Sequence, residues 1–223
     1  MAMIALSACS GGGDETTSTT EPAAAATPTP TPAACTAAPI NPSEPYSLVF
    51  KGCSATNEAE YYDKAECVRD NATGYIWQGQ TPAGSGLRAN DQKKTNYDST
   101  TALQKETIGV GVSAPTQAEV DALSNSIGFK NAVNASALCG RSTWEVPSQA
   151  QLRTLVKSGS SPAIDATWFP NLSSGKYWTS TSSATVTNAR LVNFADGSDW
   201  TGLRGYTPPA NVVRLVSTSC VSC

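Results

Sequence analysis

The side chains that most often carry acid–base and nucleophilic chemistry are few in this chain of 223 residues. It contains no histidine, which removes the commonest general base, the Ser-His and Cys-His nucleophile pairs, and zinc sites that need imidazole. The most closely spaced cysteines are Cys220 and Cys223, and a Cys-x-x-Cys pair can exchange thiols and disulfides. In an exported protein such a pair is more often structural or simply oxidised. The sequence therefore predicts no enzyme, no catalytic residue and no bound cofactor.

Two nearby carboxylates raise the possibility of a metal site. Asp196 and Asp199 lie on either side of Gly197 and Ser198, and oxygen ligands of this kind suit a hard cation such as Ca²⁺. The dipeptide Asp196-Gly197 is also the ordinary chemistry of a hairpin turn. We therefore expect a turn here and no metal ligand.

A segment with the residue types of a binding surface follows this turn. Trp200, Arg204 and Tyr206 occur close together with no apolar periodicity, and rigid rings and guanidinium groups are enriched at binding hot spots. The alternative is that Trp200 folds back on the domain and only packs. We expect the following residues to form one ligand-binding surface: Asn193, Asp196, Ser198, Asp199, Trp200, Arg204 and Tyr206.

The strand before the turn should position that surface. Side chains alternate between the two faces of a strand. With Val192 and Phe194 pointing to the core, Leu191, Asn193 and Ala195 should point outward. Outward side chains do not decide core packing, so this part of the chain should tolerate sequence change.

Local patterns predict an α+β domain with helices in the middle and strands towards both ends. Capping boxes at Thr116-Gln117-Ala118-Glu119 and Ser148-Gln149-Ala150-Gln151 indicate two helix starts. The first helix should bury Val120, Leu123 and Ile127 and stop at Gly128, and residues 129 to 138 should add one or two further turns. Residues 79 to 113 should form a long loop with little regular structure. The expected strands cover residues 75–77, 177–180, 191–194 and 212–216, with a turn at residues 70–74 before the first of them.

Charge and apolar content exclude two classes of partner or function. The net charge is −3, whereas duplex nucleic-acid binding needs clustered Lys and Arg. No apolar run approaches the roughly 18 residues of a membrane-spanning helix. Four of the 18 acidic residues precede Lys51 and no basic residue does, so the remainder holds 15 basic and 14 acidic residues. The acidity therefore belongs to the N-terminal part, and we expect no nucleic-acid partner.

The N-terminal region resembles a bacterial lipoprotein export signal followed by a tether. Leu6-Ser7-Ala8-Cys9 is similar to a lipobox, which implies cleavage before Cys9 and lipidation of its sulfur. A basic n-region is absent before this motif, so we expect the true start to lie further upstream. Residues 1–9 are thus a truncated signal peptide, and residues 10–45 are a disordered Thr/Pro/Ala-rich linker. Ser10 favours the outer membrane or cell surface, with the membrane contacted through the lipid anchor.

Export to an oxidising compartment predicts disulfides. The six cysteines beyond Cys9 allow 15 pairings. Cys53 with Cys67 is the most local choice, and the pairing of Cys35, Cys139, Cys220 and Cys223 stays open.

Beyond the tether lie four segments that form one pattern: residues 67–77, 134–140, 144–155 and 177–216. In this order they resemble one bacterial family, the Lcl-like surface domain named for the C-terminal region of a collagen-like adhesin. The third segment departs from that family in having Glu145-Val146 where it usually has Arg-Leu, so no role of that arginine is carried over. Trp77, Trp144 and Trp178 lie in these segments beside apolar neighbours and should pack in the core.

The resemblance implies a C-type-lectin-like fold over residues 46–223, related to the fold of formylglycine-generating enzymes. In that fold the N- and C-terminal strands pair and long loops present a binding surface. The expected function is a lipid-anchored surface protein that binds a host or environmental glycan or protein. Some lectin-like surface proteins are diversified by retroelements that rewrite one C-terminal segment. The resemblance implies residues 188–211 as the segment that such an element would rewrite. The alternative is a structural envelope lipoprotein with no dedicated ligand.

Overall fold

A computed structural model describes residues 34–107, 109–173, 175–205 and 211–218. The chain divides into two units, and the second, which contains all the described residues, begins at Ala34. Residues 34–45, which the sequence pattern assigns to the linker, therefore lie in this second unit. Cys35 forms a disulfide with Cys53, and the Ala38 amide donates to the Tyr61 hydroxyl at 2.8 Å, so these residues belong to the folded unit. The predicted signal peptide, Cys9 and the linker up to residue 33 lie outside the described residues.

One antiparallel sheet joins strands from the beginning and the end of the domain. A turn precedes its third strand, as predicted: Asp70 Oδ1 accepts the amides of Ala72 and Thr73, and Gly74 has a φ of 75°. The first and last strands lie at opposite edges, so the terminal strands share this sheet but do not pair with each other. The strand order is β1 (Tyr46–Leu48), β4 (Cys67–Asp70), β5 (Ile76–Gln78) and β11 (Val216–Ser217).

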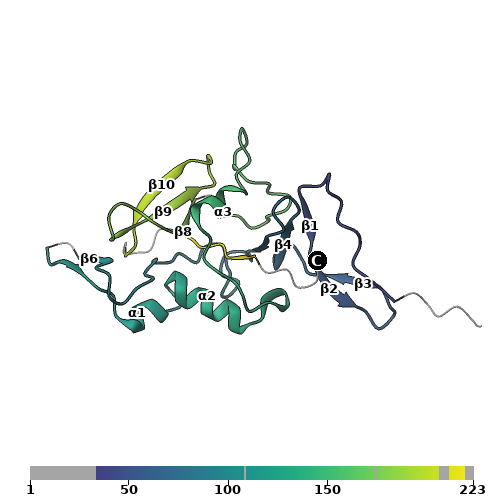
Figure 1. Ribbon diagram of the computed structural model, residues 1–223, viewed down its shortest axis with the longest axis horizontal. Coiled ribbons are helices and arrows are strands. Elements are labelled where there is room, and N and C mark those ends of the chain that lie inside the picture. The colour runs from purple at the N-terminus through teal and green to yellow at the C-terminus, as the bar shows by residue number, and fades with distance from the viewer. Residues whose placement is uncertain (1–33, 108, 174, 206–210, 219–223) are drawn as a thin grey trace, which may run out of the picture. The chain divides into compact units, whose positions relative to one another are not determined.

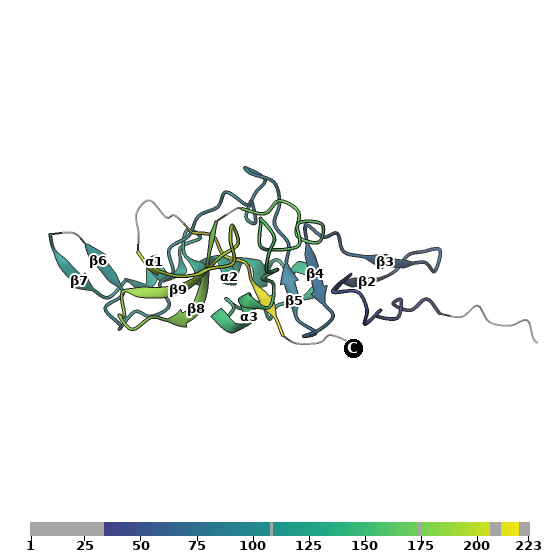
Figure 2. The ribbon, with the colours of Figure 1, turned by 90° about the horizontal axis from the view of Figure 1, so that it is seen from above.

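A second antiparallel sheet carries the predicted binding segment. The other described strands form two separate hairpins. Figures 1 and 2 show the second sheet beside α3, which packs against β8 and β9. The hairpin β6–β7 lies in the segment expected to be irregular. The second sheet has the order β10 (Asp199–Leu203), β9 (Asn188–Asn193) and β8 (Lys176–Ser182), and the hairpins are β2 (Phe50–Cys53) with β3 (Ala59–Tyr61) and β6 (Lys105–Thr107) with β7 (Gly111–Ser113).

The helices begin where the capping boxes predict, but the first one ends early. The helices are α1 (Gln117–Asp121), α2 (Ser126–Ala135) and α3 (Gln149–Arg153), and a 3₁₀ turn covers Leu138–Gly140. Both capping boxes are present. A single helix to Gly128 was the wrong expectation, because the chain breaks after Asp121 and Leu123 is 57% exposed. Gly128 packs against the end of α1, where a Cβ atom would meet the Ala122 carbonyl oxygen at 2.2 Å.

Two groups of buried side chains form the core. Trp144 and Trp178 belong to one and Trp77 to the other, and each of these side chains is at most 1% exposed, which confirms the prediction for the three tryptophans. The domain is thus a mixed α and β fold with small sheets, as the patterns predict. Within the described ranges, none of the helices has the length and apolar run that a bilayer crossing requires.

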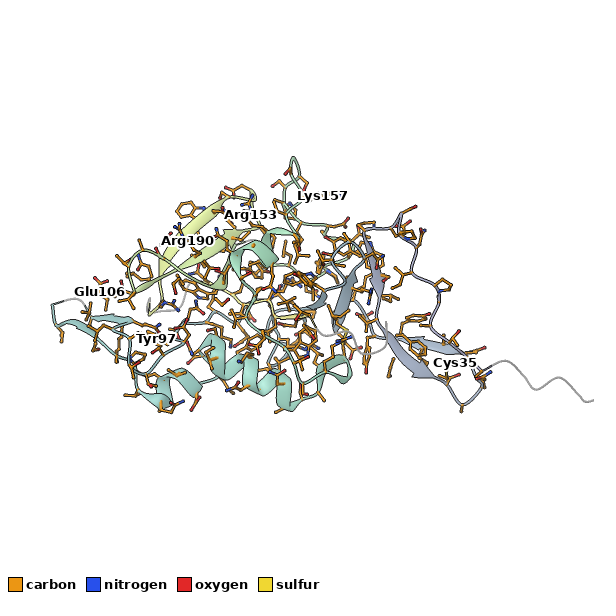
Figure 3. All side chains as sticks on the ribbon, in the orientation of Figure 1. Cys35, Tyr97, Glu106, Arg153, Lys157 and Arg190 are labelled. Carbon is orange, nitrogen blue, oxygen red and sulfur yellow. A yellow bond between two sulfur atoms is a disulfide. The ribbon has the colours of Figure 1, made fainter. Side chains whose placement is uncertain are left out.

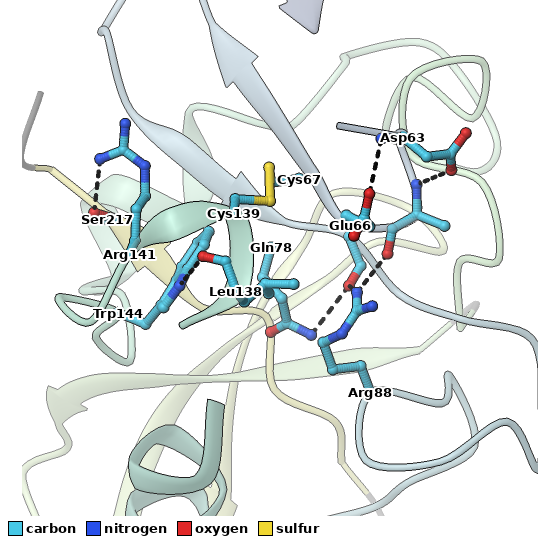
Figure 4. Close-up of a disulfide and its surroundings, with 12 residues drawn as sticks. Asp63, Glu66, Cys67, Gln78, Arg88, Leu138, Cys139, Arg141, Trp144 and Ser217 are labelled. Carbon is cyan, nitrogen blue, oxygen red and sulfur yellow. Dashed lines mark hydrogen bonds between the residues drawn. A yellow bond between two sulfur atoms is a disulfide. The ribbon is translucent and has the colours of Figure 1, made fainter. Parts of the chain in front are cut away.

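Disulfides join parts of the chain that are distant in sequence. Cys67 on β4 bonds to Cys139 in the 3₁₀ turn, and Cys35 bonds to Cys53 (Figure 4 shows the first pair). The predicted pair Cys53–Cys67 is therefore wrong. Cys67 is fully buried and faces the core, where Cys139 is also buried, whereas Cys53 lies on the separate β2–β3 hairpin. Cys220 and Cys223 lie outside the described residues.

A buried guanidinium connects the two sheets. Val212 bonds to β8 through its backbone, and Val216 pairs with Trp77 of β5, so the intervening residues cross from one sheet to the other. Between them, Arg214 is fully buried and donates to the Gln78 carbonyl oxygen at 2.6 Å and to Gln80 Oε1 at 2.8 Å. Desolvation lowers the pKa of Arg214. Its interactions must therefore compensate for a charge taken out of water.

We predict that Arg214→Ala lowers the free energy of unfolding by about 3 kcal/mol or more, because it leaves a cavity and an unsatisfied Gln78 carbonyl. Urea denaturation measures the change. The exposed Arg190→Ala is the matched control and should stay within about 0.5 kcal/mol of the wild type. Equal losses for the two variants would show that the buried contacts contribute no net stability.

Candidate functional site

The turn between β9 and β10 is organised by the side chain of Asp196. Its Oδ1 atom accepts from Asn193 Nδ2 at 2.8 Å, from the Ser198 amide at 3.0 Å and from the Ser198 hydroxyl at 2.6 Å. Hydrogen bonds from Ser198 hold the pKa of Asp196 below its ordinary value. Gly197 adopts a φ of 78°, as an Asp-Gly turn requires. The predicted turn is therefore present.

Trp200 is tied to the same turn. Its indole Nε1 donates to the Ser198 hydroxyl oxygen at 2.8 Å, and this hydroxyl in turn donates to Asp196. Lys176 Nζ lies 3.6 Å from the ring centroid, within cation–π range. The side chain of Trp200 is nonetheless 46% exposed. We call these residues the Trp200 network: Asn193, Asp196, Ser198, Trp200 and Lys176.

The strand under Trp200 is held close to the core by a glycine. Gly202 lies two residues further along the same face of β10, and a Cβ atom there would meet Leu191 Cδ1 at 2.8 Å and Trp178 Cη2 at 3.2 Å. Trp200 itself pairs with Leu191 in the strand register. The ring is thus exposed on top of a tightly packed support.

The predicted alternation of β9 is only partly correct. Val192 and Phe194 are fully buried, as expected, but Leu191 is 1% exposed and Asn193 is 9% exposed, so neither points freely outward. The reason is that both faces of this sheet are covered: Leu191 packs in the core group of Trp178, and Val192 packs in that of Tyr177.

Asp199 lies on the other face of β10 from Trp200. Its carboxylate forms an ion pair with Arg153 of α3 at 2.7 Å, and both side chains are almost half exposed. Arg190 Nη1 donates to the Thr201 hydroxyl at 3.3 Å on this second face (Figure 3 shows Arg153 and Arg190 beside the sheet). Asp196 and Asp199 therefore do not converge. No cluster of three or more metal-ligating side chains occurs among the residues that the structure describes.

Arg204 is a correction to the predicted surface. It is 1% exposed, and its Nη1 atom donates to the Asn96 carbonyl oxygen at 2.7 Å and to Asp98 Oδ2 at 2.8 Å. The guanidinium thereby joins the loop that contains Asn96 and Asp98 to the second sheet. Its Nη2 atom also donates to the Ser182 hydroxyl oxygen at 3.3 Å. Its side chain therefore packs inside the domain and is not part of the exposed surface around Trp200. Tyr206 lies outside the described residues.

Two cations near the site were not predicted. Lys176 begins β8 and Arg153 ends α3, and neither belongs to the segment that carries Trp200. Lys176 lies two residues before Trp178, so strand alternation correctly places both side chains on one face of the sheet. Its contact with Trp200 requires knowledge of which strands pair.

We predict that Ser198→Ala raises the pKa of Asp196 towards the ordinary value of 3.8, because the carboxylate loses the hydrogen bond that this hydroxyl donates and keeps the one from the residue 198 amide. The ionised Asp196 carboxylate accepts these hydrogen bonds, so it stabilises the turn at pH values above the ordinary pKa. This contribution is lost as the pH falls through the lowered pKa of the folded state. Carboxyl and indole NMR titrations measure both ends of the network. The exposed Ser158→Ala should leave both signals unchanged, and an unchanged Asp196 titration in Ser198→Ala would contradict the network.

Comparison with protein families supports the resemblance that the four sequence segments indicate. The family model for the Lcl C-terminal domain matches residues 66–217, which include β4, β5, all three helices and the β8–β10 sheet. Curated proteins and solved structures gave no match. The match covers well over half of the chain, and the chain belongs to the Lcl C-terminal domain family.

Proposed function

We propose that this protein is a lipid-anchored surface module that binds a host or environmental glycan or protein through the Trp200 network. The observation that carries the proposal is an exposed tryptophan whose indole nitrogen and ring are both held by neighbouring side chains. An aromatic side chain fixed before binding loses little conformational entropy on contact, so its area contributes efficiently to affinity. The protein acts by binding and not by catalysis.

The charge around Trp200 defines what it can contact. Lys176 contributes a positive charge at the ring, while Asp196 uses Oδ1 for three hydrogen bonds within the turn. A ligand with acceptor groups can bind the Lys176 ammonium while an apolar face or C–H group packs on the indole. Both a glycan and a protein surface offer such a combination.

A C-type-lectin-like plan is part of this proposal. It is supported by the four-stranded sheet that contains both the first and the last described strand. It is also supported by the second sheet, whose edge strand β10 carries Trp200. Within residues 188–205, outward side chains such as Arg190, Trp200 and Thr201 can vary without disturbing the core, so diversification in this described part is expected at such positions.

Trp200→Ala should weaken ligand binding at least tenfold and shift the melting temperature by no more than a few degrees, because the side chain is half exposed and its support is retained. A glycan array and a cell-binding assay with the full chain measure binding. Leu123→Ala is the matched control, since Leu123 is also an exposed large apolar residue but lies between α1 and α2. Unchanged binding by Trp200→Ala would overturn the assignment of this face, and no saturable binding by the wild type would favour the structural alternative.

Anchoring rests on the lipobox and on the two disulfides, which suit an oxidising compartment outside the cytoplasm. Cys9→Ser should move the protein from the membrane fraction to the soluble fraction, because the sulfur that accepts the lipid is removed. Fractionation after expression from the native gene, with radiolabelled palmitate, measures both location and lipidation. A wild-type protein that incorporates no label would contradict the anchor.

A further inference from the structure

A cavity lies away from the Trp200 network, at the opposite end of β10. It has a volume of about 630 Å³, which is within the usual range of small-molecule sites. Glu106 belongs to β6 of the β6–β7 hairpin, and Tyr97 lies near this hairpin in Figure 3. The lining side chains that matter for the argument are Thr95, Tyr97, Lys105, Glu119, Thr187 and Leu203.

One wall of the cavity is held rigidly by a buried amide. Asn125 is fully buried, accepts the Tyr97 amide at 2.8 Å and donates to the Tyr97 carbonyl oxygen at 2.9 Å. The Thr95 hydroxyl also donates to Asn125 Oδ1 at 3.0 Å. Gly205 packs against the Tyr97 ring, because a Cβ atom there would meet the Tyr97 hydroxyl oxygen at 2.0 Å. The wall therefore exists before any ligand enters.

The facing wall presents a donor beside an acceptor. Lys105 Nζ lies 2.6 Å from Glu119 Oε1, and each side chain is about one-third exposed. The other carboxylate oxygen, Oε2, accepts the Thr116 amide at 2.8 Å as part of the capping box of α1. The helix start thus fixes Glu119, and Glu119 in turn fixes the ammonium group of Lys105.

This donor–acceptor pair fits two neighbouring hydroxyl groups of a ligand. Each hydroxyl both donates and accepts, so one can accept from Lys105 while its neighbour donates to Glu119. Leu203 is 37% exposed and lines the same cavity, offering an apolar surface for C–H groups. The charged lining residues are Lys105, Glu106 and Glu119, so the cavity carries a slight negative charge and disfavours an anionic ligand.

The geometry points to a binding site for a neutral saccharide in this cavity, with the Lys105–Glu119 pair bonding vicinal hydroxyls and Tyr97 and Leu203 forming the wall. The site is separate from the Trp200 network and does not depend on it. It needs no metal ion, because the two charged side chains supply the polar contacts.

Saturation-transfer NMR and calorimetry on the full chain test the proposal with glucose, galactose, mannose, N-acetylglucosamine and their disaccharides. At least one of these neutral sugars should bind, and Lys105→Met should weaken its binding at least tenfold by removing the ammonium donor at nearly constant side-chain length. Lys157→Met is the matched control, because Lys157 also forms an exposed ion pair, with Asp165 at 3.5 Å. It should bind as the wild type does.

Two further variants separate this site from folding effects and from the proposed Trp200 surface. Thr187→Val keeps the side-chain shape and removes a lining hydroxyl, so it should weaken the same sugar without changing the melting temperature. Trp200→Ala should bind the sugar normally. Absence of binding by the whole panel, equal binding by Lys105→Met and Lys157→Met, or preference for a sulfated sugar or a cationic peptide in the cavity would overturn the proposal.

Discussion

The burial of the Arg214 guanidinium is the constraint on which the rest of this fold depends. A desolvated cation must be compensated by acceptors and polarisable rings, and here these are the Gln78 carbonyl, Gln80 Oε1 and the rings of Phe169 and Tyr177. They come from β5, from two loops and from β8. Because one side chain needs all of them, the two sheets must meet along the final strand segment. Burial in the same place raises the pKa of Tyr177, whose hydroxyl donates to Gln80 Oε1 at 2.7 Å.

The same chemistry is repeated where the chain has little regular structure. Arg88 donates to the carbonyl oxygens of Ala65 and Gly79 (Figure 4), and Arg204 donates to that of Asn96. Long loops leave carbonyl groups that no neighbouring strand or helix satisfies. A guanidinium has five donors in a planar fork and can satisfy several of these acceptors at once. Arginine side chains thereby make irregular segments rigid, which is what a loop that supports a binding site requires.

The two proposed sites use one strand in different ways. At the start of β10, Trp200 is exposed over a strand that packs tightly through Gly202. At its end, Leu203 and Gly205 contribute to a cavity whose far wall is the Lys105–Glu119 pair. The first site offers an exposed aromatic ring, and the second offers polar groups inside a cavity. If both proposals hold, the domain contacts one large ligand at two points or binds two different ligands.

Short-range chemistry in the sequence was sufficient to predict the capping boxes at Thr116 and Ser148, the turns at Asp70 and Asp196, and the three core tryptophans. Each depends on neighbours within a few residues or on plain hydrophobicity. The burial of Arg204 and Leu191, the contact of Lys176 with Trp200, and the bond between Cys67 and Cys139 were decided only by the tertiary structure. Those features join residues that are far apart in the chain. Which faces of a strand are covered, and which cysteines meet, depends on how the sheets pack, and local periodicity carries no information about that.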